Sequence, residues 1–244
     1  MLTYLRTGTP AYQEIFGRPF WEDLDAHPEI AESFDNGTFW RTDAWGVLDA
    51  HPEIAESFDR LMGPEGHGVP DPEIPLTGGW EALRSVVDVG GGTGAMLAEI
   101  LRARPWIHGT LIDLPRTVAS ATELFRSAGL TGRVTVIGQS FFDRLPAGAD
   151  LYMLRGVLND WPDRDAAAIL RRCAAAARPG GRVMVLKSVG PEAPAPGLPI
   201  EMLLLGGRHR TIAEFRVLAN QSGLEVVAAG RGETGQFAVE CRPV

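Results

Sequence analysis

The stretch from Val86 to Gly94, which reads VVDVGGGTG, constrains this chain more than any other segment. An apolar run breaks abruptly into glycines, and a helical pattern of apolar residues begins directly afterwards, at Met96. This order predicts a strand, a tight turn and a helix. Glycines let a ligand approach the backbone closely, and a helix offers free N–H groups at its N-terminus. The stretch therefore predicts a cofactor loop rather than a turn without a ligand.

Predicted strands alternate with predicted helices from residue 80 to the end of the chain. The expected strands are 85–89, 109–112, 134–137, 150–154, 182–187, 224–229 and 236–241, of which the last two form a hairpin. A helix is expected over 211–222, because Thr211 as N-cap and Glu214 at the third helical position match a capping box. This alternation predicts an α/β fold with a doubly wound, Rossmann-like, mostly parallel seven-stranded sheet and a C-terminal antiparallel hairpin. Because such sheets bind ligands at the carboxyl ends of their strands, polar residues that follow a strand are site candidates.

The region before residue 80 differs in character from the rest of the chain. Residues 1–79 are rich in aromatic and acidic side chains and predict a short helical lead-in to a domain that spans residues 80–244. Within this lead-in the twelve-residue segment LDAHPEIAESFD occurs at 24–35 and again at 48–59. Repeat architectures seldom have identical units, and two copies are too few to stack into one. We interpret the repeat as a local segment duplication, in which one copy packs natively and the other is an extra helix or insert.

Composition excludes several classes of function. The chain has 244 residues, of which 45% are hydrophobic, so it can bury one sizeable core. Its net charge of −8 argues against a general nucleic-acid binder or an anionic-membrane binder. We see no signal peptide and no apolar run approaching the roughly 20 residues that span a bilayer. Cys173 and Cys241 match no metal-binding spacing, so we expect buried reduced thiols, a cytoplasmic protein and no metal site.

The glycines alone do not identify the cofactor. Gly90, Gly92 and Ala95 loosely fit a dinucleotide loop, and Asp113 follows at the distance of a ribose-binding carboxylate. Asp88, however, stands two residues before the first glycine, where it can accept a hydrogen bond from a cationic amine. Gly94 adds a further alternate glycine, and no second mononucleotide-binding half follows. These features disfavour NAD and favour another adenosyl ligand.

The glycine stretch resembles the first motif of class I S-adenosylmethionine-dependent methyltransferases, and further motifs follow in order. These are the segments DLP at 113–115, RV at 133–134 leading to FF at 141–142, VLNDW at 157–161, PGGRV at 179–183 and GGRHRT at 206–211. Together they are similar to the plant caffeate and actinobacterial polyketide O-methyltransferase family over residues 80–244. The stretch 12–58 resembles the helical lead-in of actinobacterial members that act on antibiotics.

The resemblance implies S-adenosylmethionine as cofactor and assigns its contacts. Gly90 would lie near the methionine and ribose parts, Asp113 would hold the ribose hydroxyls, and Ser140 and Phe141 would flank the adenine. Arg155 stands where the family has a lysine at the cofactor carboxylate, and Ser140 stands where it usually has an aspartate. The predicted cofactor-binding residues are Asp88, Gly90, Gly92, Asp113, Leu114, Ser140, Phe141 and Arg155.

The residues expected at the acceptor depart from the family pattern. Asn159 replaces a histidine that acts as base in plant-type members, and an amide orients an acceptor but removes no proton. His209 stands where the family usually has a glutamate and is a candidate replacement base, or an orienting loop residue. Glu201 is the carboxylate nearest to an expected aspartate, and it either accepts a proton or faces solvent. Asp160 would shape the acceptor pocket, and Trp21 would stack on an aromatic acceptor or pack in the core.

The sequence thus predicts an O-methyltransferase that moves a methyl group to a hydroxyl, expected to be phenolic, of a secondary metabolite in antibiotic biosynthesis. Two alternatives stay open: an S-adenosylmethionine-binding homologue with other chemistry, such as hydroxylation, and a non-catalytic cofactor-binding partner. Family members carry a longer N-terminal domain that dimerises and closes the acceptor pocket. We therefore expect a homodimer, or a partner subunit that supplies this part.

Overall fold

The computed structural model describes residues 70–192, 209–232 and 235–244 of the chain. Residues 1–69 of the predicted lead-in, which include the duplicated segment and Trp21, lie outside these residues, as does Glu201. The division of the chain at residue 80 therefore stays a prediction.

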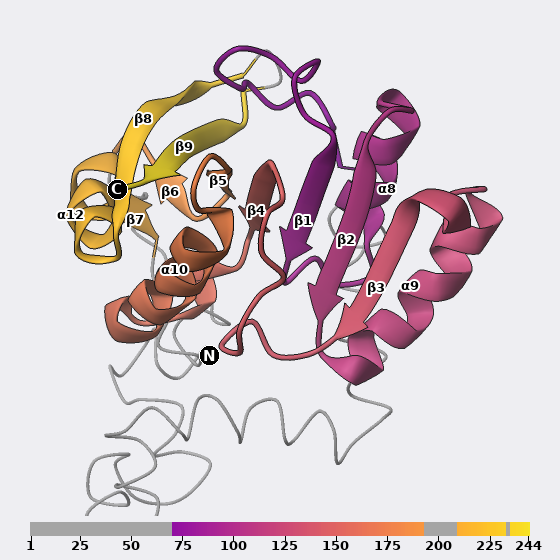
Figure 1. Cartoon of the computed structure of the whole chain (residues 1–244). Coiled ribbons are helices and arrows are strands. Elements are labelled where there is room, and N and C mark those ends of the chain that lie inside the picture. The colour runs from indigo at the N-terminus through magenta and orange to yellow at the C-terminus, as the bar shows by residue number, and fades with distance from the viewer. Residues whose placement is uncertain (1–69, 193–208, 233–234) are drawn as a thin grey trace, which may run out of the picture. The chain divides into compact units, whose positions relative to one another are not determined.

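A seven-stranded sheet with the order β3-β2-β1-β4-β5-β9-β8 forms the centre of the described domain (Figure 1). The first five strands pair in parallel, and β9 pairs antiparallel with both β5 and β8. This confirms the predicted mostly parallel sheet with its C-terminal hairpin. The strands are β1 Ser85–Val89, β2 His108–Asp113, β3 Val134–Gly138, β4 Leu151–Arg155, β5 Arg182–Leu186, β8 Leu224–Arg231 and β9 Phe237–Pro243.

Helices connect the parallel strands and cover the sheet in two groups. In the first group, α8 and α9 pack against each other and against β2 or β3; in the second, α10 and α12 pack against each other and against β8. Their bounds are α8 Ala95–Ala103, α9 Pro115–Ser127, α10 Asp163–Ala177 and α12 Ile212–Gln221, with short 3-10 turns η1 Thr131–Arg133 and η2 Leu158–Asp160. From β1 the chain steps through β2 to β3 in one direction, and from β4 to β5 in the other. Right-handed crossovers therefore place the two groups on opposite faces.

The central strands are apolar on both faces because helices cover both. In β1, β4 and β5 nearly every side chain is buried, as expected for a parallel sheet between two helical layers. Cys173 and Cys241 are buried in this core as free thiols, as the sequence predicts. Burial raises the pKa of each thiol to about 12, so neither is a reactive thiolate at neutral pH.

The chain after β5 is organised by a pairing that the sequence does not predict. We expected a strand over 182–187, but β5 ends at Leu186 because Lys187 adopts a left-handed backbone with φ 62°. The short strands β6 (Val189–Gly190) and β7 (Arg210–Thr211) then pair in parallel. Thr211 next caps α12 in a reciprocal capping box with Glu214, which confirms the expected helix start.

The carboxyl ends of the parallel strands meet at one edge of the sheet, toward which the arrowheads of β1, β2 and β3 point in Figure 1. All of the predicted site residues that the structure describes lie on this edge or on the loops that leave it, except His209, which directly precedes β7. No helix within the described ranges is long and apolar enough to cross a membrane.

Candidate functional site

The glycine loop turns sharply between β1 and α8, and its backbone requires glycine. Gly90 and Gly92 have φ values of 70° and 60°, in the left-handed region that side chains disfavour. A Cβ atom on Gly90 would lie 2.8 Å from a methyl group of Val157, whereas a Cβ on Gly92 would meet nothing within 4 Å. The loop is therefore packed against the protein at Gly90 and open at Gly92. The open backbone at Gly92 is the part that a ligand can approach.

Asp88 lies directly beneath this loop. Its side chain is 1% exposed, and neither carboxylate oxygen has a hydrogen-bond partner within the part of the chain that the structure describes. A Cβ on Gly91 would lie 2.5 Å from the Asp88 carboxyl carbon. Burial raises the pKa of Asp88 to about 7; Arg155 opposes this shift, and Asp113 adds to it. Because both oxygens are covered by the protein, Asp88 would attract a nearby cation through its buried charge. A direct hydrogen bond from an amine to Asp88 stays a prediction.

Two cationic side chains lie at the ends of the neighbouring strands β4 and β5. Arg155 ends β4 opposite Leu186, and its Nε is buried without a hydrogen-bond partner in the described ranges. Burial lowers the pKa of the guanidinium, and Asp88 partly offsets this. Lys187 follows β5, and burial and the charge of Arg155 lower its pKa. The edge therefore combines a buried acid with two cations, and Lys187 holds a strained backbone of the kind found at functional sites.

Asp113, at the end of β2, holds the glycine loop in place. Its Oδ2 accepts a hydrogen bond from the Gly92 N–H at 2.8 Å, and its Oδ1 accepts one from the Leu114 N–H at 2.7 Å. The structure thus brings Gly92, Asp113 and Leu114 together, as the cofactor-site prediction requires. Two backbone donors therefore fix the orientation of the Asp113 carboxylate at the end of β2.

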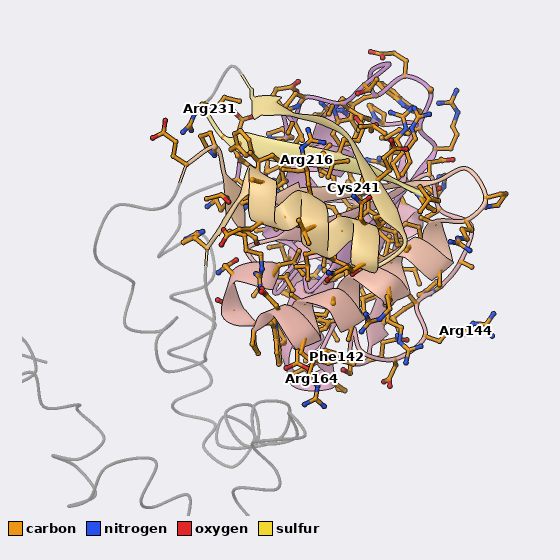
Figure 2. All side chains as sticks on the ribbon, turned by 90° about the vertical axis from the view of Figure 1, so that its left-hand side faces the viewer. Phe142, Arg144, Arg164, Arg216, Arg231 and Cys241 are labelled. Atoms are coloured by element: carbon orange, nitrogen blue, oxygen red, sulfur yellow. The ribbon has the colours of Figure 1, made fainter. Side chains whose placement is uncertain are left out.

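An aromatic cluster follows β3 on the same edge. The Ser140 Oγ accepts a hydrogen bond from the Phe142 N–H at 3.2 Å, which folds the turn that carries Phe141 and Phe142. The rings of Phe141 and Phe142 both contact Trp161 edge to face, with centroids 5.8 Å and 4.9 Å apart. In Figure 2 Phe142 lies at the same end of the domain as Arg164, near the start of α10. Phe141 also lies within 3.4 Å of the position of a Cβ on Gly90, so this turn borders the glycine loop.

Asn159 and Asp160 form the 3-10 turn η2 that follows β4. The amide Nδ2 of Asn159 donates a hydrogen bond to Asp160 Oδ1 at 2.8 Å. The buried hydroxyl of Ser188, just beyond β5, donates to the Asn159 Oδ1 at 2.8 Å. Sequence analysis missed Ser188, although its position directly after a parallel strand is the signal that selected the other candidates.

Arg210 is the second functional candidate that sequence analysis missed, although it adjoins His209 in the quoted GGRHRT motif. Its side chain is 1% exposed, and its Nε lies 2.8 Å from Asp163 Oδ1. Its two terminal nitrogens donate to the carbonyl oxygens of Leu158 at 2.6 Å and Trp161 at 2.8 Å. Arg210 therefore fastens both ends of the turn that carries Asn159.

The remaining predicted residues are placed only in part. His209 is half-buried directly before β7, one residue from Arg210, so the backbone holds it near the η2 turn. Its role as base stays a prediction, as do those of Glu201 and Trp21, which lie outside the described residues. Within residues 70–192, 209–232 and 235–244, no group of His, Cys, Asp or Glu side chains is arranged to hold a metal ion.

Replacing Gly91 by alanine tests the packing of the loop over Asp88. The new methyl group would lie 2.5 Å from the Asp88 carboxylate and from a Leu111 methyl group. We expect the free energy of unfolding to fall by roughly 1–3 kcal/mol in chemical denaturation, because the loop must shift to accept it. Gly132→Ala is the matched control, since a Cβ there meets nothing within 4 Å. Equal stability of the two variants would contradict the close packing described here.

Comparisons with known proteins identify the family of this chain. A 2,7-dihydroxy-5-methyl-1-naphthoate 7-O-methyltransferase of Streptomyces carzinostaticus is 41% identical over 232 residues, which cover 92% of this chain and 61% of that relative. An aclacinomycin 10-hydroxylase of Streptomyces purpurascens is 38% identical and is covered over 56% of its length. The chain thus spans about three fifths of these curated relatives.

A solved structure resembles the whole chain. It is an O-methyltransferase from neocarzinostatin biosynthesis, crystallised with S-adenosylmethionine and 2-hydroxy-5-methyl naphthoic acid. It is 38% identical with a TM-score of 0.74, and the match covers 100% of this chain and 66% of that one. The family model of the O-methyltransferase domain matches residues 3–225. The chain belongs to the family defined by this O-methyltransferase domain.

Proposed function

We propose that this chain binds S-adenosylmethionine and transfers its methyl group to a hydroxyl of an aromatic secondary metabolite. The observation that carries the proposal is a pair of buried groups, the Asp88 carboxylate and the Arg155 Nε, which have no hydrogen-bond partner within the described residues. They lie at the same edge of the sheet as the open backbone at Gly92. The neighbouring residues fit the cofactor, because an amino-acid zwitterion needs one charge of each sign and a ribose needs a carboxylate such as Asp113. The Asp88 charge would favour the ammonium group, and Arg155 would bind the carboxylate group.

The remaining cofactor residues have roles consistent with this placement. Gly90 and Gly92 let the loop approach the cofactor, and Leu114, Ser140 and Phe141 would enclose the adenine at the ends of β2 and β3. When bound, S-adenosylmethionine supplies an activated methyl group on a sulfonium. The protein aligns the acceptor oxygen with that methyl group and excludes water. On this assignment Asn159 orients the acceptor hydroxyl, and Asp160 shapes its surroundings.

Methyl transfer is favoured over the hydroxylase-like and non-catalytic alternatives by the family match and by relatives whose names are O-methyltransferases. Those relatives are named as a dihydroxynaphthoate O-methyltransferase and a mitomycin biosynthesis O-methyltransferase, which supports a polycyclic phenol or a related hydroxyl compound as acceptor. A homodimer or a partner subunit, and a cytoplasmic location, are parts of the same proposal.

Two measurements test this function. Calorimetry with S-adenosylmethionine, S-adenosylhomocysteine and NAD should show binding of the first two and none of NAD. Incubation with methyl-labelled cofactor and 2-hydroxy-5-methyl naphthoic acid or related hydroxynaphthoic acids should give a labelled methyl ether. A product that gains oxygen instead of a methyl group would support the hydroxylase-like alternative, and cofactor binding without any product would support a non-catalytic partner.

A further inference from the structure

The hydrogen bonds around Asn159 run in one direction. The Ser188 hydroxyl donates to the Asn159 Oδ1, and the Asn159 Nδ2 donates in turn to Asp160 Oδ1, each over 2.8 Å. Ser188 is fully buried, and Arg210 fastens the carbonyl oxygens on both sides of the turn. The amide is therefore held between two partners rather than free to rotate.

The chemistry of the partners fixes which end of the amide faces which neighbour. An ionised carboxylate only accepts hydrogen bonds, so Asp160 must face the NH2 end of Asn159. The carbonyl end then turns to Ser188, whose hydroxyl supplies the hydrogen. One N–H of the amide is left without a partner in the described part of the chain. This N–H is consequently a hydrogen-bond donor that Asn159 can offer to a substrate, while the buried Ser188 hydroxyl takes one of the two lone pairs of its carbonyl oxygen.

We propose that Asn159, oriented by Ser188 and Asp160, donates its remaining N–H to an acceptor that enters the site as a phenolate anion. The enzyme would thus select hydroxyls acidified by an electron-withdrawing group on the same ring system, such as a carbonyl. This inference rests on the proposed methyl transfer. A hydrogen-bond donor next to the oxygen of the methyl acceptor stabilises the charged phenolate more than the neutral phenol.

The charges near Asn159 are compatible with an anionic acceptor. Asp160 is negative, but its Oδ1 is engaged by the Asn159 amide, and Asp163 is paired with Arg210. Arg155 and Lys187 add positive charge at the ends of β4 and β5, the strands that precede Asn159 and Ser188. Neighbouring cations favour an incoming anion over a neutral phenol. His209, adjacent to Arg210, is also held near this turn.

The transfer step is balanced without a protein base. The acceptor releases its proton to solvent when it binds, and an oxygen lone pair then forms the O–CH3 bond. The C–S bond breaks, its electron pair returns to sulfur, and the sulfonium and phenolate become a neutral thioether and a neutral ether. His209 has no proton to remove in this step, which explains how Asn159 can occupy the position of a base.

A spectroscopic titration tests the proposal without requiring turnover. The probe is 4-nitro-1-naphthol, whose anion absorbs in the visible range, bound to the full chain with S-adenosylhomocysteine. We expect the pKa of the bound naphthol to lie about one to two units below its value in solution, because a hydrogen bond to a charged group has this strength. Asn159→Ala and Ser188→Ala should lose most of that shift. Ser222→Ala is the matched control, because it removes another buried hydroxyl, which donates to the Leu218 carbonyl.

Binding of the neutral naphthol, or an unchanged shift in Asn159→Ala, would overturn the inference. Kinetics separate this failure from failure of the proposed function. With 1-naphthol and 4-nitro-1-naphthol as methyl acceptors, kcat/KM should level off at a lower pH for the more acidic 4-nitro-1-naphthol. The same difference between the two acceptors should be found in His209→Ala. A methylated product formed with the same pH profile for both acceptors would refute the phenolate inference but leave the methyltransferase intact. Absence of S-adenosylmethionine binding in calorimetry would refute the function itself.

Discussion

Asp88→Asn is expected to make the ligand-free protein relatively more stable above pH 7 while weakening its binding of S-adenosylmethionine. The Asp88 carboxyl is buried beneath the glycine loop, and burial raises its pKa to about 7 from an ordinary value of 3.8. Below the ordinary pKa the carboxyl is protonated in both the folded and the unfolded chain. Between the two values only the folded chain keeps the proton, so stability falls as pH rises, by about 1.4 kcal/mol per pH unit. Above pH 7 the carboxyl is ionised in the folded chain as well, and the free energy of unfolding is lowered by the full cost of burying the charge.

An asparagine at position 88 cannot ionise and removes this pH dependence. The difference in free energy of unfolding between variant and wild type should therefore grow in favour of the variant from pH 5 to pH 8. Urea denaturation at several pH values measures it. Asp143→Asn is the control, because it removes the same formal charge from an exposed side chain. A parallel pH profile for wild type and Asp88→Asn would show that the buried carboxyl does not carry the effect.

Ligand binding should respond in the opposite sense. An ammonium group near Asp88 is attracted only by the ionised carboxylate, so wild-type affinity for S-adenosylmethionine should rise as pH increases through 7. Asp88→Asn should bind it roughly ten- to a hundredfold more weakly at pH 8, with little dependence on pH. Adenosine lacks the ammonium and should bind both proteins alike. Equal loss of adenosine and S-adenosylmethionine affinity would indicate damage to the loop instead of a lost charge.

Much of the described fold could be predicted because the relevant signals are local. The run before Gly90 is apolar except for Ser85 and Asp88, and a parallel strand covered on both faces needs a mainly apolar run, so β1 matches its predicted bounds Ser85–Val89. The Thr211 capping box uses only neighbouring residues, and the predicted start of α12 is correct for that reason. The end of β5 was predicted one residue too late, because nothing in a lysine predicts a left-handed backbone.

The parts of the site that sequence analysis missed depend on contacts between distant segments. Ser188 and Asn159 are 29 residues apart, and a serine after a strand has no local pattern that predicts its partner. Nothing local in the sequence marks Arg210 as buried, because a charged residue in a loop motif is normally exposed. Its burial follows from the β6–β7 pairing and from carbonyl oxygens 49 and 52 residues away. The cofactor loop lies on one strand–turn–helix unit, whereas the acceptor turn is assembled from three separate segments.

The same long-range assembly makes Arg210→Lys the second change with a large expected effect. The guanidinium bonds at once to Asp163 Oδ1 and to the carbonyl oxygens of Leu158 and Trp161. A lysine keeps the charge but is a single point donor, so it cannot reproduce this planar fork. We expect the free energy of unfolding to fall by roughly 2–4 kcal/mol, because buried carbonyl groups lose a charged donor. Arg126→Lys is the control, since Arg126 pairs with Glu123 on the exposed surface of α9, where an ion pair contributes little.

The catalytic consequence of Arg210→Lys should be confined to the acceptor, because Arg210 fastens the turn that carries Asn159. We expect kcat/KM for a hydroxynaphthoic acid to fall at least tenfold, at a temperature where the variant is fully folded, as a misplaced orienting group costs about this much. The affinity for S-adenosylmethionine, measured by calorimetry, should change by less than about twofold, since Asp88, Asp113 and Arg155 lie on other strands. A parallel loss of cofactor affinity and acceptor turnover would mean that Arg210 supports the domain as a whole. A loss confined to acceptor turnover means that the buried guanidinium positions Asn159.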